Sequence, residues 1–257
     1  MKVLVTGANG YIGSVVMEKL EAAGVDVKGI DIEDWDIRES NWFSNRYNTV
    51  VHLAALVKVG ESVRVPWDYY DTNVNGTMNV ILANPFAKII FASTGAAFNP
   101  TSPYGMSKVM AEEIIKEYCD EYTIFRFYNV GGRIPNNPEG LYQATQNAIE
   151  NKEIKIFGND YNTKDGTCIR DYVHVDDIAD AIVKAVLEPA ANTDYEPLGS
   201  GKSHTVKEYI DTFLEVNGNL FDVVYTDRRL GDLEKSEVPF MSKFMEPKHS
   251  LEDIVRL

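Results

Sequence analysis

The sequence predicts an α/β protein built around a doubly wound parallel sheet, with a smaller C-terminal α/β lobe. Two observations carry this prediction. Short apolar runs alternate with helical stretches over the first 151 of the 257 residues, and beyond about residue 152 the runs become shorter and are separated by loops. Alternating strands and helices are typical of a parallel sheet with helices on both faces.

A glycine-rich turn follows the first predicted strand directly. Residues 2–6 read Lys-Val-Leu-Val-Thr, and Gly7, Gly10 and Gly13 follow at intervals of three while residues 11–23 form an amphipathic helix. Glycines let the backbone approach a pyrophosphate, and the helix N-terminus offers it free N–H groups and a positive dipole end. This strand, turn and helix predict a Rossmann-type dinucleotide site.

The second predicted strand, residues 25–30, ends at Asp31. A carboxylate about 20 residues beyond the glycine turn can accept both ribose hydroxyls of NAD. It would repel the 2'-phosphate of NADP, and no Arg or Lys follows within the next six residues. The competing interpretation is an ordinary strand-end aspartate in a turn, but the glycine context favours NAD as the cofactor.

Further along, strands and helices continue to alternate. A candidate ligand-binding residue comes just after each of five predicted strands: Gly7, Asp31, Ala54, Thr94 and Asn129. Ligands of such sheets gather outside the carboxyl ends of the strands, so we expect these five residues on one rim. The remaining predicted strands are 49–53, 88–92 and 122–127, and the helices are 66–83, 103–119 and 140–151.

The pattern divides the chain into two regions. We predict an NAD-binding Rossmann domain over 1–151, which carries the catalytic residues, and a region over 152–257 that mainly binds substrate. The second region has predicted strands at 154–158 and 172–175 and helices at 176–187 and 205–217. No Gly/Ser-rich linker separates the two, so we expect them to pack closely.

Tyr104 and Lys108 are four residues apart, downstream of Thr94. On a helix, residues four apart share a face, so the ammonium of Lys108 can lie beneath the phenol of Tyr104. A nearby cation lowers a phenol pKa, which is otherwise near 10. Thr94 would hydrogen-bond the reacting oxygen. By itself such a pair is usually a solvated surface pair, but beside a dinucleotide turn it predicts redox chemistry on a carbinol.

Composition limits the partners. A net charge of −14 argues against nucleic acid and anionic membranes. No apolar run has the length of a membrane span, and no signal peptide precedes the first strand, so we expect a cytoplasmic protein. Cys119 and Cys168, with four scattered histidines, have no metal-site spacing, so we predict no metal. His52 and His174 are interpreted as core or rim residues.

Longer stretches resemble the UDP-glucose 4-epimerase family of the extended short-chain dehydrogenase/reductase superfamily. The glycine turn and Tyr-x-x-x-Lys occur throughout the superfamily, whereas residues 156–161, 165–175 and 228–232 are typical of nucleotide-sugar epimerases. Residues 3–13, 51–55, 59–62, 69–77 and 125–129 extend the likeness over nearly the whole chain. The chain is a shortened form of this family, because the segments between Asp31 and Asp36 and between Thr94 and Tyr104 are shorter than is usual in it.

The resemblance implies how NAD would be held. The implied pyrophosphate contacts are Gly7, Gly10, Tyr11, Ile12 and Gly13, with Asp31 at the ribose, Asp36 and Ile37 beside the adenine, and Leu53, Ala54, Ala55, Asn73, Tyr104, Lys108 and Tyr128 along the remainder.

It also implies a site for the nucleotide sugar. The implied contacts are Thr94, Asn129, Leu141, Lys155, Phe157, Arg170, Arg229, Asp232 and Ser236. Guanidinium groups match the two phosphates of a UDP-sugar, although a single arginine outside such a context is more often a surface salt-bridge partner. Ser236, four residues after Asp232, is small enough to leave room for an N-acetyl group.

The implied activity is NAD-dependent 4-epimerisation of a UDP-hexose, glucose and galactose or their N-acetyl forms, through a transient 4-keto sugar and with tightly bound NAD. Residues after Thr94 lack the Asp-Glu pair of related 4,6-dehydratases. Two alternatives remain: an NAD(P)-dependent reductase or decarboxylase acting on another nucleotide sugar, and a non-catalytic dinucleotide-binding protein. The helices 66–83 and 103–119 pair across a two-fold axis in relatives, which implies a homodimer.

Overall fold

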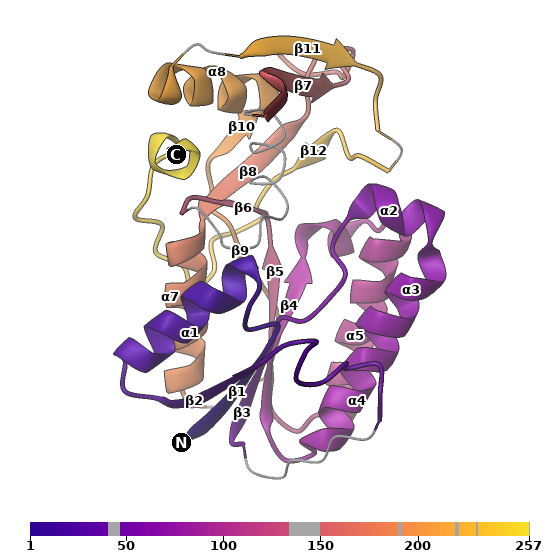
Figure 1. The fold of residues 1–257 in the computed structure, drawn as a ribbon, viewed down its shortest axis with the longest axis vertical. Helices are drawn as coiled ribbons and strands as arrows, with labels where there is room; N and C mark the ends of the chain where they lie inside the picture. The colour runs from indigo at the N-terminus through magenta and orange to yellow at the C-terminus, as the bar shows by residue number, and fades with distance from the viewer. Residues whose placement is uncertain (41–46, 134–149, 190–191, 219–220, 230, 257) are drawn as a thin grey trace.

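A computed structural model gives the fold of the protein (Figure 1). It describes residues 1–40, 47–133, 150–189, 192–218, 221–229 and 231–256. The predicted site residue Leu141 and most of the predicted helix 140–151 lie outside these ranges.

The larger sheet has six strands, all parallel, which confirms the predicted doubly wound α/β fold. Their order is β2-β1-β3-β4-β5-β9. The bounds are β1 (Lys2–Thr6), β2 (Asp26–Ile30), β3 (Thr49–His52), β4 (Lys88–Thr94), β5 (Tyr122–Phe127) and β9 (Thr193–Leu198). The chain leaves β1 toward β2 on one side and places β3 on the other, so the strand order reverses at β1, the position at which such sheets bind ligands.

Helices cover both faces of this sheet. On one face, α1 (Tyr11–Ala22) lies against α7 (Val175–Leu187); on the other lie α2 (Val59–Arg64), α4 (Gly76–Ala83) and α5 (Pro103–Tyr118) (Figure 1). Successive strand residues point to opposite faces. Val3 and Val5 therefore pack into the core on the side of α1 and α7, and Leu4 packs into the core on the other side.

The predicted helix 66–83 is helical throughout but is not one α-helix. It consists of α3 (Pro66–Tyr70), a π-helical turn η1 (Asp71–Asn75) and α4. The buried side chain of Asn73, within η1, donates to the carbonyl of Leu56 at 3.0 Å and accepts from its N–H at 2.9 Å. Wide turns of this kind often occur at functional sites, and this one fixes the loop after β3.

The smaller lobe is built on β8 (Ile169–His174), which pairs with β6 (Asn129–Gly131), β10 (Ser203–Thr205) and β12 (Lys235–Ser236). A separate parallel pair joins β7 (Glu153–Phe157) to β11 (Asp222–Thr226). Beside it, α8 (Val206–Asn217) lies against β7, and α9 (Leu251–Val255) packs against α8 and β8. Both β9 and α7 come from the predicted second region yet belong to the larger sheet and its helical layer. The predicted second region therefore contributes a strand and a helix to the larger sheet and its helical layer.

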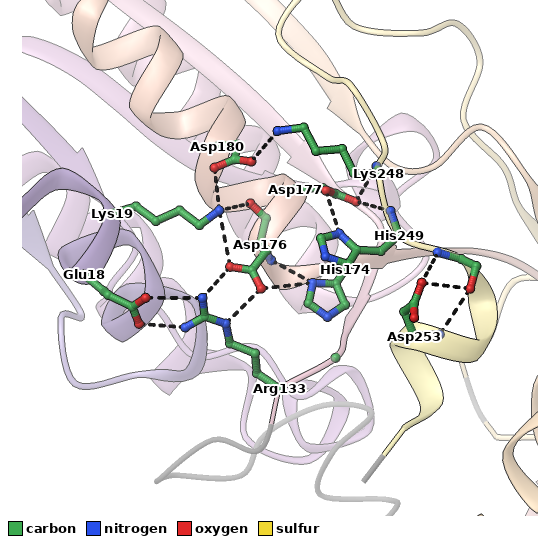
Figure 2. A network of polar contacts seen from close by, with 12 residues as sticks. Glu18, Lys19, Arg133, His174, Asp176, Asp177, Asp180, Lys248, His249 and Asp253 are labelled. Carbon is green, nitrogen blue, oxygen red and sulfur yellow. Dashed lines mark hydrogen bonds and ion pairs between the residues drawn. The ribbon is translucent and has the colours of Figure 1, made fainter. Parts of the chain in front are cut away.

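A network of charged groups fastens the segment near residue 248 to the larger sheet's helices (Figure 2). Arg133 bridges Glu18 of α1 and Asp176 of α7, with nitrogen–oxygen distances of 2.7 and 2.6 Å. Lys248 reaches Asp180 at 3.0 Å, and the ring of His249 stacks on that of His174, with centroids 3.9 Å apart. The network ties α1, α7 and the C-terminal segment together.

Among the described residues, no helix combines the length and apolar character needed to cross a membrane.

Candidate active site

A cavity of about 910 Å³ opens at the carboxyl ends of the parallel strands. Its walls come from the glycine turn, the ends of β2, β3, β4 and β5, the start of α5, and the loop before β12. The loop reaches across because the hydroxyl of Thr101 donates to the carbonyl of Gly231 at 3.1 Å. One continuous space therefore runs from the dinucleotide turn to the smaller lobe.

The glycine turn has no room for side chains. Gly7 has a φ of +70°, and a Cβ there would lie 2.7 Å from the backbone nitrogen of Ala54. A Cβ on Gly13 would lie 2.0 Å from the carbonyl oxygen of Gly7. This bare backbone at the N-terminus of α1 fits a pyrophosphate, so the residues present agree with a dinucleotide cofactor.

Asp31 lies at the adjacent end of β2. Its Oδ2 accepts the backbone N–H of Asn9 at 2.8 Å, which fixes the carboxylate beside the glycine turn. Asp36 and Ile37, for which contacts with the adenine are predicted, also line the cavity. Arg38 lines it as well and pairs with Asp36; the hydrogen bonds from its guanidinium lower the pKa of that carboxyl.

Most of the other predicted cofactor contacts line the cavity: Gly7, Gly10, Tyr11, Ile12, Gly13, Leu53, Ala54, Ala55, Tyr104, Lys108 and Tyr128. Asn73 does not, because its side chain is buried behind the wall. It holds Leu56 in place and donates to the hydroxyl of Ser107 at 3.0 Å. Its position supports the wall from behind.

Thr94, Tyr104 and Lys108 all line the cavity. Thr94 ends β4, and its Oγ1 accepts the N–H of Ala96 at 3.2 Å, which leaves its hydroxyl proton for Tyr104. Enclosure raises the pKa of Tyr104, and the hydrogen bond with Thr94 acts in the opposite direction. The threonine and tyrosine thus form a hydrogen-bonded pair facing the cavity.

Lys108 is 3% exposed and donates to the carbonyl oxygen of Ala92 at 2.9 Å. Its ammonium also lies 4.7 Å from the ring centroid of Phe91. Burial lowers the pKa of Lys108 to about 7, and the charge of Glu112 opposes that change. The sequence places Lys108 on the face of Tyr104 but does not reveal that β4 holds its ammonium.

Predicted sugar-nucleotide contacts fall into two groups. Thr94, Asn129, Arg170, Asp232 and Ser236 line the cavity. Three others lie away from its wall: Lys155 is exposed and pairs with Glu153 at 3.3 Å, and the guanidinium of Arg229 lies over the ring of Phe157 at 3.5 Å. Their roles stay predictions.

In the described part of the chain, His174, Asp176 and His249 are a group whose ligand atoms lie close enough for a metal ion. Each is already engaged: Nδ1 of His174 accepts the N–H of Asp176 at 3.1 Å, Asp176 pairs with Arg133, and Nδ1 of His249 donates to Asp177 at 2.9 Å. These bonds account for all three side chains without an ion.

Two features of the site have no counterpart in the predictions. Trp35 is buried in the cavity wall beside Asp36, and its indole donates to the carbonyl of Glu39 at 3.0 Å. Behind Thr94 and Lys108 lies a buried carboxylate, Glu112. An apolar residue in a polar loop could have suggested Trp35, whereas Glu112 has no motif around it.

Comparison with protein families gives a match over residues 3–198 to the model described as "NAD dependent epimerase/dehydratase family". The match includes every element of the larger sheet. The chain belongs to this family.

Named relatives extend the family match over nearly the whole chain. UDP-glucose 4-epimerase from Halalkalibacterium halodurans is 32% identical, over 99% of this chain and 93% of its own. UDP-glucose 4-epimerase from Rhizobium meliloti is 34% identical, over 90% of this chain and 86% of its own.

Solved structures agree with these relatives. UDP-glucose 4-epimerase from Bifidobacterium longum, in complex with NAD+ and UDP, superposes with a TM-score of 0.88 at 26% identity, over 99% of this chain and 96% of its own. The enzyme from Thermotoga maritima with UDP-glucose gives 0.85 at 29% identity, over 100% of this chain and 96% of its own. The UDP-Glc/GlcNAc 4-epimerase of Campylobacter jejuni gives 0.75 at 28% identity, over 99% and 97%.

Proposed function

We propose that this protein catalyses the NAD-dependent 4-epimerisation of a UDP-hexose through a transient 4-keto sugar. The observation that carries the proposal is that Thr94, Tyr104 and Lys108 line one cavity together with the glycine turn and Arg170. The likeness to UDP-glucose 4-epimerases along the whole chain supports the same reaction.

NAD would lie between the glycine turn and Tyr104. Gly7, Gly10 and Gly13 would take the pyrophosphate, and Asp31 would accept the ribose hydroxyls. NAD, when bound, supplies the hydride acceptor and donor for C4 of the sugar. Asp31 would disfavour a 2'-phosphate by charge repulsion, which makes NAD rather than NADP the proposed cofactor.

Tyr104 would move the proton of the 4-hydroxyl. Its phenolate would take that proton as C4 becomes a carbonyl, and the resulting phenol would return a proton as the alcohol re-forms. Thr94 would hydrogen-bond the same oxygen in both states. Lys108, as a buried cation, would favour the ionised phenol against the enclosure that raises its pKa. The 4-keto sugar must present its other face before the hydride returns.

The residues after Thr94 favour epimerisation over water loss. The short helix η2 (Gly95–Phe98) reads Gly-Ala-Ala-Phe and has no carboxylate to remove a proton from C5. Three residues that line the cavity would hold the UDP moiety. Arg170 would offer its guanidinium to a phosphate, and Asn129 and Asp232 would offer polar groups. Lys155, Phe157 and Arg229 would have to move toward the cavity to take part.

Sugar size would be set partly by Ser236. It lies in β12, beside Arg170 of β8, and lines the cavity. A small side chain at this point supports acceptance of N-acetylated hexoses as well as glucose and galactose.

We also propose a homodimer built on α4 and α5. Met106, Met110, Ile114 and Tyr118 follow one another at intervals of four, and all but Ile114 are exposed. Beside them, Leu82 is 69% and Phe86 88% exposed. Such a stripe of large apolar side chains on neighbouring segments supports burial against a second copy.

A cytoplasmic location is the companion proposal. Cys119 and Cys168 are both free thiols, and Cys168 is buried. Unpaired cysteines are usual in a reducing compartment.

An NMR time course tests the reaction. The purified protein is mixed with a catalytic amount of NAD and either UDP-galactose or UDP-N-acetylgalactosamine. We expect the 4-epimer to accumulate without net NADH, and conversion of the second sugar measures the tolerance for the N-acetyl group. In parallel runs with excess cofactor, accumulation of NADH from NAD with a changed sugar would instead indicate an oxidative reaction such as a decarboxylation, and consumption of added NAD(P)H would indicate a reductase. No conversion with NAD bound would indicate a non-catalytic binding protein.

A further inference from the structure

Glu112 is a fully buried carboxylate on the face of α5 that carries the proposed reactive groups. Tyr104, Lys108 and Glu112 follow at intervals of four, so they lie in one row along the helix. Glu112 is 0% exposed, whereas its neighbour Glu113 is exposed and pairs with Lys116 at 2.8 Å. An unneutralised charge at the position of Glu112 would be strongly disfavoured.

Two strands supply its partners. Arg126 of β5 binds it with both prongs, Nε to Oε1 at 2.9 Å and Nη2 to Oε2 at 2.6 Å. The hydroxyl of Ser93, in β4, donates to Oε1. Since Ser93 immediately precedes Thr94, this carboxylate connects the strand end that carries Thr94 to the helix that carries Tyr104.

The charge of Glu112 also reaches Lys108, one turn earlier. Burial lowers the pKa of Lys108, and Glu112 is the carboxylate that opposes this. One anion therefore lies between two buried cations, Lys108 and Arg126, which are 3% and 8% exposed. Removing Glu112 would take away the charge that opposes the effect of burial on Lys108.

Among the residues that the structure describes, the other titratable groups around Lys108 supply no comparable anion. His52 of β3 is neutral, because burial and then the charge of Lys108 lower its pKa to about 3. Tyr104 shares α5, and Tyr69 of α3 lies edge-on to the ring of Tyr104, with centroids 6.4 Å apart. Burial, followed by the hydrogen bond with Glu61 of α2, raises the pKa of Tyr69, so it too is uncharged at neutral pH.

A purely structural role for Glu112 is the competing interpretation, in which it serves only as the ion-pair partner that joins α5 to β5. Packed apolar residues generally join elements as well as a buried ion pair does. An ion pair that only joined α5 to β5 would not require Glu112 to lie one turn from Lys108 or to accept a hydrogen bond from Ser93.

We propose that Glu112 is a positioning residue for the reaction: its carboxylate keeps Lys108 in the cationic form and fixes the end of β4, with Thr94, against the helix that carries Tyr104. The consequence for activity rests on the proposed function, whereas the charge of Lys108 does not.

The test measures the titration of Lys108 in the full-length protein, with and without NAD. Lysines are labelled with ¹³C and ¹⁵N, and the Lys108 signal is assigned by its absence in Lys108→Arg. Glu112→Gln removes the anion, and Arg126→Lys disrupts its two-pronged ion pair but keeps the anion. Glu113→Gln is the matched control, because it removes one negative charge from the exposed face of the same helix.

The two buried substitutions are expected to differ in their effect on Lys108. Glu112→Gln lowers the pKa of Lys108 by about one unit or more, whereas Arg126→Lys, which disrupts the two-pronged ion pair but keeps the carboxylate, leaves it near the wild-type value. Both lower the melting temperature, and Glu113→Gln leaves the titration unchanged. If Glu112→Gln lowers the melting temperature without moving the Lys108 titration, Glu112 is only a structural partner and the proposal fails. Should Glu112→Gln not fold, Glu112→Asp decides the outcome in the same way, because its shorter side chain draws the carboxylate back from Lys108.

Activity provides the second measurement. Lys108 must be charged, so kcat/KM falls as pH rises through its pKa. In Glu112→Gln this alkaline limb moves to lower pH, whereas in Arg126→Lys it stays near its wild-type position. If the wild-type protein epimerises no sugar, the proposed function fails, but the titration of Lys108 still tests the role of Glu112. If the wild-type protein is active and Glu112→Gln changes neither the titration of Lys108 nor the pH profile, only the role of Glu112 fails.

Discussion

The buried carboxylate of Asp177 accepts a hydrogen bond from the imidazole Nδ1 of His249, at 2.9 Å, across 72 residues of sequence. The same carboxylate also accepts the backbone N–H groups of Lys248 and His249, at 3.2 and 3.4 Å. These bonds anchor the C-terminal segment to the first turn of α7 (Figure 2).

Replacing Asp177 by Asn should loosen this anchor. An amide at this position can present an oxygen to only some of the three donors, and it carries no charge. We expect the free energy of unfolding to fall by about 1–3 kcal/mol, the usual cost of leaving buried hydrogen-bonding groups unsatisfied. Urea denaturation measures the loss, with Asp26→Asn, an exposed change in β2, as the control. Equal stability of the two variants would show that the segment is held by other contacts.

Tyr104→Phe removes the proposed proton-transfer group and little else. Its rate of epimerisation should fall by about 10²- to 10⁴-fold, the range for loss of a general acid–base, while NAD binding stays near the wild-type level. Rates come from the NMR assay and binding from titration of NAD. Tyr225→Phe, on the exposed strand β11, should be as active as the wild type. Full activity of Tyr104→Phe would remove this phenol from the mechanism.

Gly13→Ala should impair the cofactor site specifically. The added Cβ would lie 2.0 Å from the carbonyl oxygen of Gly7, so the turn that would receive the pyrophosphate must shift. We expect the Kd for NAD to rise at least about ten-fold, equivalent to about 1.4 kcal/mol. Gly60→Ala is the control, since a Cβ at Gly60 meets nothing within 4 Å. Unchanged NAD binding in Gly13→Ala would mean that the pyrophosphate lies elsewhere.

A double change to Leu82→Glu and Met110→Glu tests the proposed dimer. Both side chains are exposed on α4 and α5, so the changes should not disturb the core of the subunit. Charges in an apolar contact would be desolvated without partners, so we expect monomers by sedimentation velocity where the wild type is dimeric. Leu187→Glu, exposed at the end of α7, should leave the dimer intact. A wild-type protein that sediments as a monomer would contradict the proposal directly.

Local patterns predicted the parts of the fold that depend on neighbouring residues. The bounds of β1 and β5 agree with the apolar runs, and Tyr104 and Lys108 share a face because their spacing requires it. The π-helical turn in the segment 66–83 depends on a contact between Asn73 and Leu56, which no local pattern contains. The same is true of the ammonium of Lys108, which is held by the carbonyl of Ala92.

Residues of the cavity wall could be predicted where they belong to a sequence motif. They could not be predicted where their role depends on burial by distant segments of the chain. Gly7, Asp31 and Thr94 follow strands and therefore line the cavity at the carboxyl edge of the sheet. No sequence pattern indicates a role for Glu112, since a glutamate next to another glutamate in a helix is usually solvated. Its importance arises only because Arg126 and Ser93, from two other elements, enclose it.

The position of β9 at the edge of the larger sheet has a consequence for biosynthesis. β5 is complete at residue 127, but the strand that covers its outer edge spans residues 193–198. During translation the nascent chain therefore carries an open β5 edge, rich in aromatic and β-branched residues, until some 70 further residues have emerged. Open apolar edges invite pairing with other chains. Chains stopped before residue 193 should aggregate and be substrates for chaperones, even though they contain the whole glycine turn and the Tyr104–Lys108 pair.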